Sequence, residues 1–214
     1  MIKNILFDFD GVICESVHIK TEAFYEMYLP YGEEIAQKVK EHHLANGGMS
    51  RFDKFRYYEE TFLKKHLTKT REDELSAHFS QLVKEKVIGA PFVNGALEFL
   101  KEHAQHYRCF IVSATPMDEM IEIAKAKKID HYFKKICGSP KNKIEWGAYI
   151  LQTWQLKPEE TLFIGDALSD YRAAQAHQMH FLLRRTVDNR TLFSESIESM
   201  EDLTHLPLFL SENT

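Results

Sequence analysis

The chain has 214 residues, 44% of them hydrophobic, which suits one substantial folded domain, or a core with a smaller insertion, and excludes a disordered chain. Its formal net charge is -5 and it carries no basic run, so nucleic acid and anionic membranes are not expected partners. No cationic leader or apolar run of transmembrane length is visible, and the three cysteines are expected to be buried, reduced thiols, which favours a cytoplasmic location.

The apolar residues 5–7 predict a short first strand that runs directly into an acidic turn. Alternation along this strand sends Asp8 and Asp10 to the same side, and Gly11 allows a sharp turn just after them. Two carboxylates this close repel each other unless a cation or a reaction keeps them ionised. The pattern favours a hard-cation site with one carboxylate as nucleophile and the other as acid/base, although a solvated acidic turn has the same sequence.

From residue 17 to residue 87 the apolar residues recur at helical spacing, and no strand is indicated. We expect four helices here. The second ends near Asn46, Ser50 can cap the third, and the fourth starts at Thr70 or Asp73. This segment is therefore predicted to be a small, all-helical unit.

Beyond residue 88 the pattern changes to helices that alternate with short apolar strands. These strands are predicted at residues 109–112, 136–137, 161–164 and 181–183. The alternation requires right-handed crossovers and a Rossmann-like α/β core, with a parallel sheet covered by helices on both faces. We therefore expect residues 1–16 and 88–214 to form this core and residues 17–87 to form a helical cap inserted into it.

Polar side chains follow the predicted strands at their carboxyl ends, where open parallel sheets bind ligands. In chain order they are Asp8 and Asp10, Ser113 and Thr115, Lys141 and Lys143, and Asp166 and Asp170. Carboxylates can hold Mg²⁺, while an ammonium, a hydroxyl and backbone N–H groups can neutralise the oxygens of a phosphoryl group. This set of residues suits phosphoryl transfer to a carboxylate.

These residues resemble, in order, the four sequence motifs of the haloacid dehalogenase (HAD) superfamily of hydrolases. The matching segments, which extend over the whole chain, are Asp8-Phe9-Asp10-Gly11, Ser113, Lys143, and Gly165-Asp166 with Asp170. The inserted helical unit resembles the first type of cap in that superfamily. The resemblance implies a Mg²⁺-dependent phosphatase that hydrolyses a small phosphorylated metabolite through an aspartyl-phosphate.

The resemblance also implies a role for each matching residue. Asp8 is the expected nucleophile, and Asp10 is expected to protonate the leaving alcohol and then to activate water. The expected metal ligands are Asp8, the backbone carbonyl of Asp10, Asp166, and Asp170, the last directly or through water. The residues expected to bind the substrate are Gly11, Ser113, Ala114 and Lys143 in the core and Arg51 in the cap.

The cap segment Gly48-Met49-Ser50-Arg51 resembles the cap loop of β-phosphoglucomutases, in which the matching arginine binds the distal phosphate of the substrate. A phosphosugar mutase is therefore the alternative function. A solvated arginine in the first turn of a helix explains the same segment equally well.

Further points stay open on the sequence alone. Lys141 is the alternative to Lys143 as the site lysine, and a helix-start charge would also explain Asp170. A dehalogenase and a phosphonate hydrolase are disfavoured because those branches lack an aspartate equivalent to Asp10. A binding module without turnover is the alternative from another class. Neither the substrate (a sugar phosphate, phosphoglycolate or a nucleotide) nor the oligomeric state can be read from the sequence.

Overall fold

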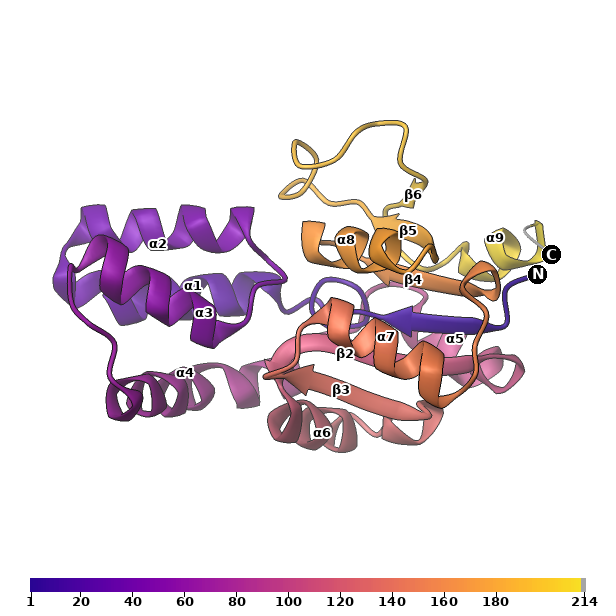
Figure 1. The fold of residues 1–214 in the computed structure, drawn as a ribbon, viewed down its shortest axis with the longest axis horizontal. Coiled ribbons are helices and arrows are strands. Elements are labelled where there is room, and N and C mark those ends of the chain that lie inside the picture. The colour runs from indigo at the N-terminus through magenta and orange to yellow at the C-terminus, as the bar shows by residue number, and fades with distance from the viewer. Residues whose placement is uncertain (213–214) are drawn as a thin grey trace.

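The computed structural model describes residues 1–212, and within them one sheet of six strands has the order β3-β2-β1-β4-β5-β6 (Figure 1). The strands are β1 (Asn4–Phe7), β2 (Arg108–Pro116), β3 (Lys135–Ser139), β4 (Thr161–Gly165), β5 (His180–Arg184) and β6 (Ser199–Met200). Every neighbouring pair is parallel, which confirms the predicted α/β core. The short edge strand β6 is a strand that the sequence did not indicate.

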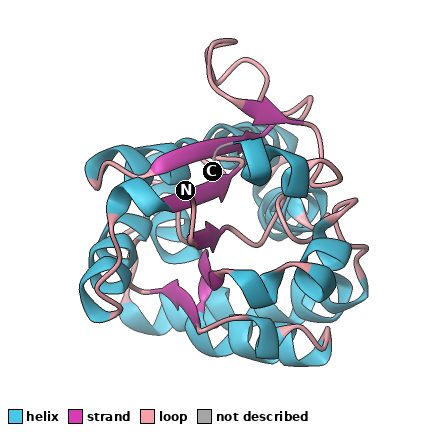
Figure 2. Ribbon diagram, turned by 90° about the vertical axis from the view of Figure 1, so that its right-hand side faces the viewer, coloured by secondary structure: helices cyan, strands magenta, loops and turns pink. Residues whose placement is uncertain are grey.

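Helices cover both faces of this sheet (Figure 2). The core helices are α5 (Ala96–Glu102), α6 (Met117–Ala126), α7 (Lys143–Thr153), α8 (Leu168–Ala176) and α9 (Leu206–Glu212). Successive side chains of a strand point to opposite faces. Phe7 therefore belongs to an apolar cluster with residues of α5, α6 and α9, whereas Leu6 belongs to a second cluster with residues of α7 and α8.

The chain between β1 and α5 forms a helical unit at the carboxyl ends of the strands (Figure 1). Its helices are α1 (Val17–Tyr28), α2 (Glu33–Ala45), α3 (Arg51–Tyr57) and α4 (Lys69–Gly89), and a π-helical turn (Tyr58–Phe62) follows α3. Single 3-10 turns lie at Leu29–Tyr31, Ala104–His106, Asp130–Tyr132 and Pro158–Glu160. We refer to residues 17–89 as the cap.

Hydroxyl groups begin two of the cap helices. Ser50 is the N-cap residue of α3, as predicted, because its Oγ accepts a hydrogen bond from the N–H of Asp53 (3.2 Å). The predicted start of the fourth helix was wrong: Thr68 Oγ1 accepts from the N–H of Arg71 (3.3 Å), so α4 begins earlier, at Lys69. It also continues beyond the predicted end of the cap at residue 87.

The cap has an aromatic interior of its own. The ring of Phe24 in α1 lies 5.7 Å from that of Phe55, 5.8 Å from that of Tyr58 and 4.3 Å from that of Phe79. All four side chains are buried. Because these rings come from α1, α3 and α4 and from the turn after α3, they fix the positions of the cap helices relative to one another.

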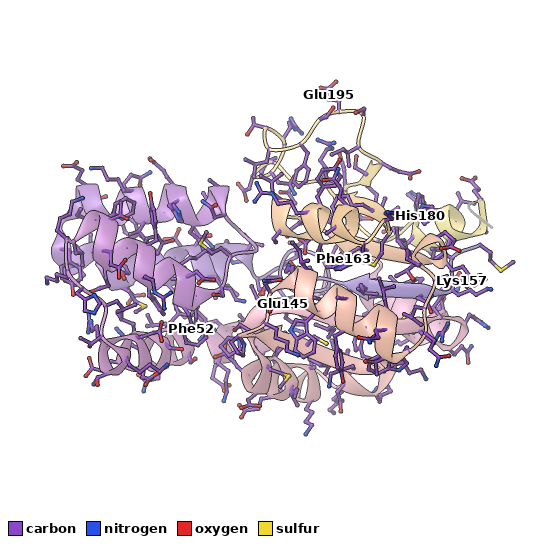
Figure 3. All side chains as sticks on the ribbon, viewed as in Figure 1. Phe52, Glu145, Lys157, Phe163, His180 and Glu195 are labelled. Carbon is purple, nitrogen blue, oxygen red and sulfur yellow. The ribbon has the colours of Figure 1, made fainter. Side chains whose placement is uncertain are left out.

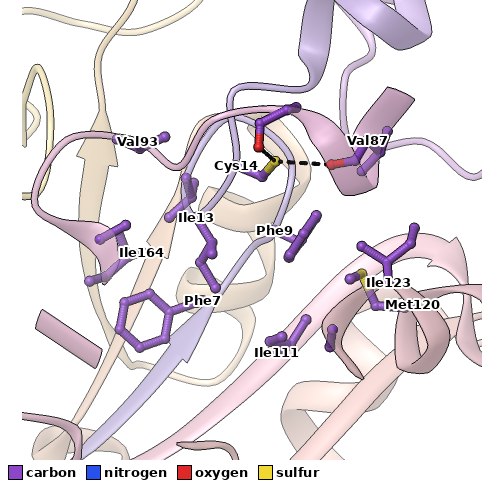
Figure 4. Packing of buried hydrophobic residues seen from close by; sticks show 14 of the residues in the cluster. Phe7, Phe9, Ile13, Cys14, Val87, Val93, Ile111, Met120, Ile123 and Ile164 are labelled. Carbon is purple, nitrogen blue, oxygen red and sulfur yellow. Dashed lines mark hydrogen bonds between the residues drawn. The ribbon is translucent and has the colours of Figure 1, made fainter. Parts of the chain in front are cut away.

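The two segments that connect cap and core lie side by side. The N–H of Glu15 donates to the carbonyl of Pro91 (3.0 Å), and the thiol of Cys14 donates to the carbonyl of Val87 (3.7 Å; Figure 4). Burial raises the pKa of Cys14 to about 11, so this group stays a thiol and is no nucleophile. Cys109 and Cys137 are also buried and free, as predicted.

Only one end of the core faces the cap. In Figure 3, Glu145 at the start of α7 lies at the end of the core nearest the cap, whereas Lys157 lies at the opposite end. The carboxyl ends of the strands therefore meet the cap, and this junction is where the sequence places the site. Within residues 1–212, no helix is both long enough and apolar enough to cross a membrane.

Candidate active site

The carboxylate of Asp8 lies just beyond β1 and contacts a buried lysine. The N–H of Asp8 donates to the carbonyl of Ile164 in β4 (2.9 Å), which continues the parallel pairing and fixes the direction of the side chain. Lys143 Nζ lies 2.7 Å from Asp8 Oδ2 and 2.5 Å from Asp170 Oδ1, and the Lys143 side chain is only 4% exposed. One ammonium group thus joins two carboxylates that come from different parts of the chain.

A third carboxylate completes what we call the acidic cluster, Asp8, Asp166 and Asp170, whose oxygens lie within 4.8 Å of one another. Burial, with the charges of Asp170 and Asp10, raises the pKa of Asp8 to about 7 although Lys143 opposes this. Burial and the charges of Asp8 and Asp170 likewise raise the pKa of Asp166 well above its ordinary value. One lysine does not balance three carboxylates, so the cluster fits an added divalent cation with oxygen ligands, such as Mg²⁺.

Within residues 1–212, the carboxylate of Asp166 forms no hydrogen bond or ion pair with the protein, whereas both oxygens of Asp170 have partners. Asp170 Oδ2 accepts from the N–H of Ala167 (3.0 Å) at the start of α8. Asp170 thus combines the two interpretations that the sequence left open, a helix-start charge and a member of the acidic cluster. Gly11 has φ +76°, and a Cβ atom at this position would collide with the carboxylate of Asp166.

The start of α7 determines which lysine enters the acidic cluster. Asn142 Oδ1 accepts from the N–H of Glu145 (2.9 Å), and the carboxylate of Glu145 accepts from the N–H of Asn142 (2.7 Å). This capping box makes Lys143 the first residue of the helix. Lys141 precedes the box, and its ammonium lies over the ring of Trp146, 4.9 Å from the centroid. Of the two candidates, Lys143 is the lysine that contacts the cluster.

Asp10 lies in a different electrostatic environment from Asp8. Its Oδ2 accepts from Lys20 Nζ (2.5 Å) and its Oδ1 from Ser16 Oγ (2.6 Å). Burial acts to raise its pKa, but the charge and hydrogen bond of Lys20 and the hydrogen bond of Ser16 outweigh burial and hold the pKa of Asp10 below its ordinary value. Asp10 is therefore an ionised group beside the acidic cluster, and its carboxylate is not a member of it.

The hydroxyls that follow β2 differ in what they contact. The Oγ of Ser113 is buried and accepts a hydrogen bond from the N–H of Thr115 (3.1 Å). Ala114 and Thr115 line the cavity described below, and Ser113 does not. Thr115 Oγ1 accepts from Lys20 Nζ (2.7 Å), which places this hydroxyl beside Asp10.

A cavity of about 720 Å³ lies between the cap and the carboxyl ends of the strands. Residues of the core form its floor and residues of the cap form its roof; they include Asp8, Asp10 and Asp166 below and Phe24, His43 and Lys54 above. The cap loop closes directly onto α8, because a Cβ atom at Gly48 would collide with the hydroxyl of Ser169. Gly48 thus permits the close approach that encloses the cavity.

Arg51 joins the cap to the core through a buried ion pair. Its Nη2 lies 2.6 Å from Glu119 Oε1 and its Nη1 lies 3.0 Å from Glu119 Oε2, with the two side chains 4% and 9% exposed. Nη1 also donates to Ser80 Oγ (2.6 Å), and the guanidinium lies over the ring of Phe79. Burial notwithstanding, Arg51 holds the pKa of Glu119 below its ordinary value. Arg51 lines the cavity, but its charge is already paired with a carboxylate.

Comparison with known proteins places this geometry in a family. The model of the family described as "Haloacid dehalogenase-like hydrolase" matches residues 5–183. The chain belongs to this family of hydrolases. No curated protein sequence matches the chain significantly.

Among solved structures, the chain is similar to β-phosphoglucomutase from Clostridium difficile, with a TM-score of 0.80, 17% identity, and coverage of 100% of this chain and 97% of that one. It is also similar to a predicted phosphoglycolate phosphatase from Haemophilus somnus, with a TM-score of 0.72, 17% identity and 98% coverage of both chains. A third is CbbY from Rhodobacter sphaeroides in complex with xylulose-1,5-bisphosphate, with a TM-score of 0.72, 16% identity and 96% coverage of both chains. At these identities the likeness establishes the shared fold.

Several residues of this HAD-like site were not singled out from the sequence. Lys20 lies one helical turn beyond Ser16, on the same face of α1, so spacing would have placed it beside Asp10. Lys54 similarly follows Arg51 by one turn of α3. The contact between Arg51 and Glu119 joins residues far apart in sequence, and no local pattern indicates it.

Proposed function

We propose that this protein is a Mg²⁺-dependent phosphatase that hydrolyses a small phosphorylated metabolite through an aspartyl-phosphate on Asp8. The observation that carries the proposal is the contrast between two carboxylates on the floor of one cavity. Asp8 belongs to the acidic cluster and contacts Lys143, whereas Asp10 is held ionised by Lys20 and Ser16. Lys143 and a divalent cation at the acidic cluster would keep Asp8 ionised as a nucleophile, and Asp10 lies beside the cluster with partners of its own, where it can exchange protons with the leaving oxygen and with water.

In the first step, Asp8 Oδ attacks phosphorus, the bond from phosphorus to the ester oxygen breaks, and Asp10 passes to that oxygen the proton that it takes from the phosphate monoester monoanion. In the second step, water attacks the same phosphorus, Asp10 takes a proton from it, and the Asp8–phosphorus bond breaks to give inorganic phosphate. Lys143 neutralises charge at Asp8 during both steps, and Lys20 favours the ionised form of Asp10 that the second step needs. Bound at Asp8, Asp166 and Asp170, Mg²⁺ would neutralise negative charge on the phosphoryl oxygens.

The cap supports this chemistry by excluding bulk water. The Arg51–Glu119 ion pair and the contact between Gly48 and Ser169 enclose the cavity over the acidic cluster. Its volume suits a metabolite and not a macromolecule. The buried free thiols fit the expected cytoplasmic location.

Phosphatase activity is favoured over mutase activity by the state of Arg51. The mutase interpretation relies on this arginine to bind the distal phosphate of a sugar, but its guanidinium is paired with Glu119. If glucose 1-phosphate became glucose 6-phosphate faster than it lost phosphate, the mutase would replace the phosphatase as the function.

A panel of small phosphate esters with and without MgCl₂ tests the proposal. We expect metal-dependent release of phosphate, and we expect Asp8→Asn to reduce it by about 10³-fold or more, because the nucleophile is lost. Asp73→Asn, which removes an exposed carboxylate of α4, is the matched control. Normal turnover by Asp8→Asn would disprove the proposed nucleophile, and no release from any ester would favour a binding module.

A further inference from the structure

The roof of the cavity contains a buried lysine that no carboxylate neutralises. Lys54 of α3 is 1% exposed and lines the cavity. Its Nζ lies 2.7 Å from Nδ1 of His43 and 5.4 Å from the centre of the Phe24 ring. Within residues 1–212, no carboxylate oxygen lies within ion-pair distance of this ammonium. A buried amine without a counter-ion costs stability, so its place in an otherwise well-packed cap calls for a ligand.

The other two lysine or arginine side chains that the cap contributes to the cavity lining, Lys20 and Arg51, are already engaged, as is Lys143 at the acidic cluster. On the core side, Arg172, Arg185 and Arg190 line the cavity without an ion pair to the described residues. Lys20 contacts Asp10, Lys143 contacts Asp8 and Asp170, and Arg51 contacts Glu119. Lys54 alone among these four has a ring nitrogen in place of a carboxylate as its partner. It is therefore the one of the four whose charge is left for a bound molecule.

His43 determines the position of this amine. Burial, together with the charge of Lys54, lowers the pKa of His43 well below its ordinary value, so the ring is neutral and Nδ1 accepts a hydrogen bond from Lys54 Nζ. Burial and then the charge of Lys20 lower the pKa of Lys54, whereas Asp10 and Asp166 act to raise it. An anion in the cavity would act in the same direction as these carboxylates and would favour the charged form of Lys54.

We propose that Lys54, positioned by His43, binds a second anionic group of the substrate, a carboxylate or a second phosphate, while the reacting phosphate lies at Asp8. The proposal rests on the proposed phosphatase function and narrows its substrate to small phosphate esters with an anion at each end. Lys54 is on the roof and Asp8 on the floor of one cavity, so a single small molecule can contact both.

Matched substrates test this assignment. We expect the wild-type protein to hydrolyse 2-phosphoglycolate, or propane-1,3-diol bisphosphate, with a kcat/KM about 10- to 100-fold higher than that for ethyl or propyl phosphate, the range given by a hydrogen bond to a charged group. The first comparison reports on a carboxylate and the second on a second phosphate. Lys54→Met should remove this preference, mainly through KM, and leave the neutral esters nearly unaffected.

Two further variants separate recognition from structure. Lys38→Met, which removes an exposed cap lysine outside the cavity, should keep the wild-type preference. His43→Leu should raise KM for the doubly anionic substrates with little change in kcat, because the ammonium loses its orientation. An equal loss on neutral and anionic esters in Lys54→Met would overturn the proposal, since it would indicate a hydroxyl ligand or a purely structural lysine.

A binding measurement keeps this test independent of turnover. Calorimetry should show that 3-phosphonopropionate, a stable analogue of 2-phosphoglycolate, binds the wild-type protein more tightly than propylphosphonate and that Lys54→Met abolishes the difference. This preference without any hydrolysis would refute the phosphatase and keep the anion site. Hydrolysis without the preference would refute the anion site and keep the phosphatase.

Discussion

The ion pair between Arg51 and Glu119 should determine how firmly the cap closes on the core. The pair is bidentate, with contacts of 2.6 and 3.0 Å, and both side chains are nearly buried. Removing one partner of a buried ion pair typically costs 3–5 kcal/mol, because the other charge stays desolvated. We expect Glu119→Gln to cost about 3 kcal/mol, since the amide can still accept one hydrogen bond from Arg51.

This cost should be paid by opening of the cap and not by global unfolding, since an open cap lets water solvate Arg51. Hydrogen exchange should therefore accelerate in the cap loop and α3 in Glu119→Gln. A double-mutant cycle with Arg51→Met and Glu119→Leu, in which hydrogen exchange measures the free energy of cap opening, should give a coupling energy of at least about 2 kcal/mol. The exposed pair Lys84–Glu122, which joins α4 to α6, is the matched control, and Lys84→Met should leave hydrogen exchange in the cap loop nearly unchanged.

The same variants distinguish a closing contact from a substrate contact. If Arg51 only closes the cap, Arg51→Met and Glu119→Gln should lower kcat/KM by similar factors. A coupling energy below about 0.5 kcal/mol, or a rise in KM confined to Arg51→Met, would refute this reasoning and return Arg51 to substrate binding.

Three other predictions follow from the charges of the site. Because the pKa of Glu119 is lowered in the folded protein, its ion pair stabilises the closed cap near neutral pH, and this contribution is lost as the pH falls below about 4. Hydrogen exchange in the cap loop and α3, corrected for the intrinsic effect of pH, should show this loss in the wild type and not in Glu119→Gln. Lys20→Met should raise the pKa of Asp10 and move the acidic limb of the pH–rate profile to higher pH, and an unchanged limb would contradict the role of Lys20. MgCl₂ at 100 times its Kd should increase the free energy of unfolding by about 2.7 kcal/mol and thereby raise the melting temperature. This gain should vanish in Asp166→Asn.

The sequence was informative wherever function depends on residues next to a strand end. The tip of β1 carries Asp8 and Asp10 because a parallel sheet directs its carboxyl ends to one edge, and alternation then sends both side chains the same way. The choice between Lys141 and Lys143 needed the capping box at Asn142, whose two hydrogen bonds define the first helical residue. Local chemistry thus determined most of the floor of the cavity.

The roof could not be derived in the same way, because its contacts join distant parts of the chain. Arg51 is compatible with solvent, a substrate or a carboxylate, and only the packing of α3 against α4 and of α4 against α6 brings it to Glu119. The burial of Lys54 depends on Phe24 and His43 from two other helices. Contacts of this kind depend on how the cap helices pack, which no short motif encodes.

The charges around the floor explain why a cation and a doubly anionic substrate belong together. Four carboxylates, Asp8, Asp10, Asp166 and Asp170, face two contacting lysines, which leaves an excess of two negative charges when all of them are ionised. Protonation of a carboxylate is one way to remove this excess negative charge, and the excess contributes to the raised pKa values of Asp8 and Asp166. A divalent cation removes it without protonating the proposed nucleophile. Once the floor is balanced, Lys54 in the roof still has no carboxylate partner, which is why we propose that it binds a second anion of the substrate.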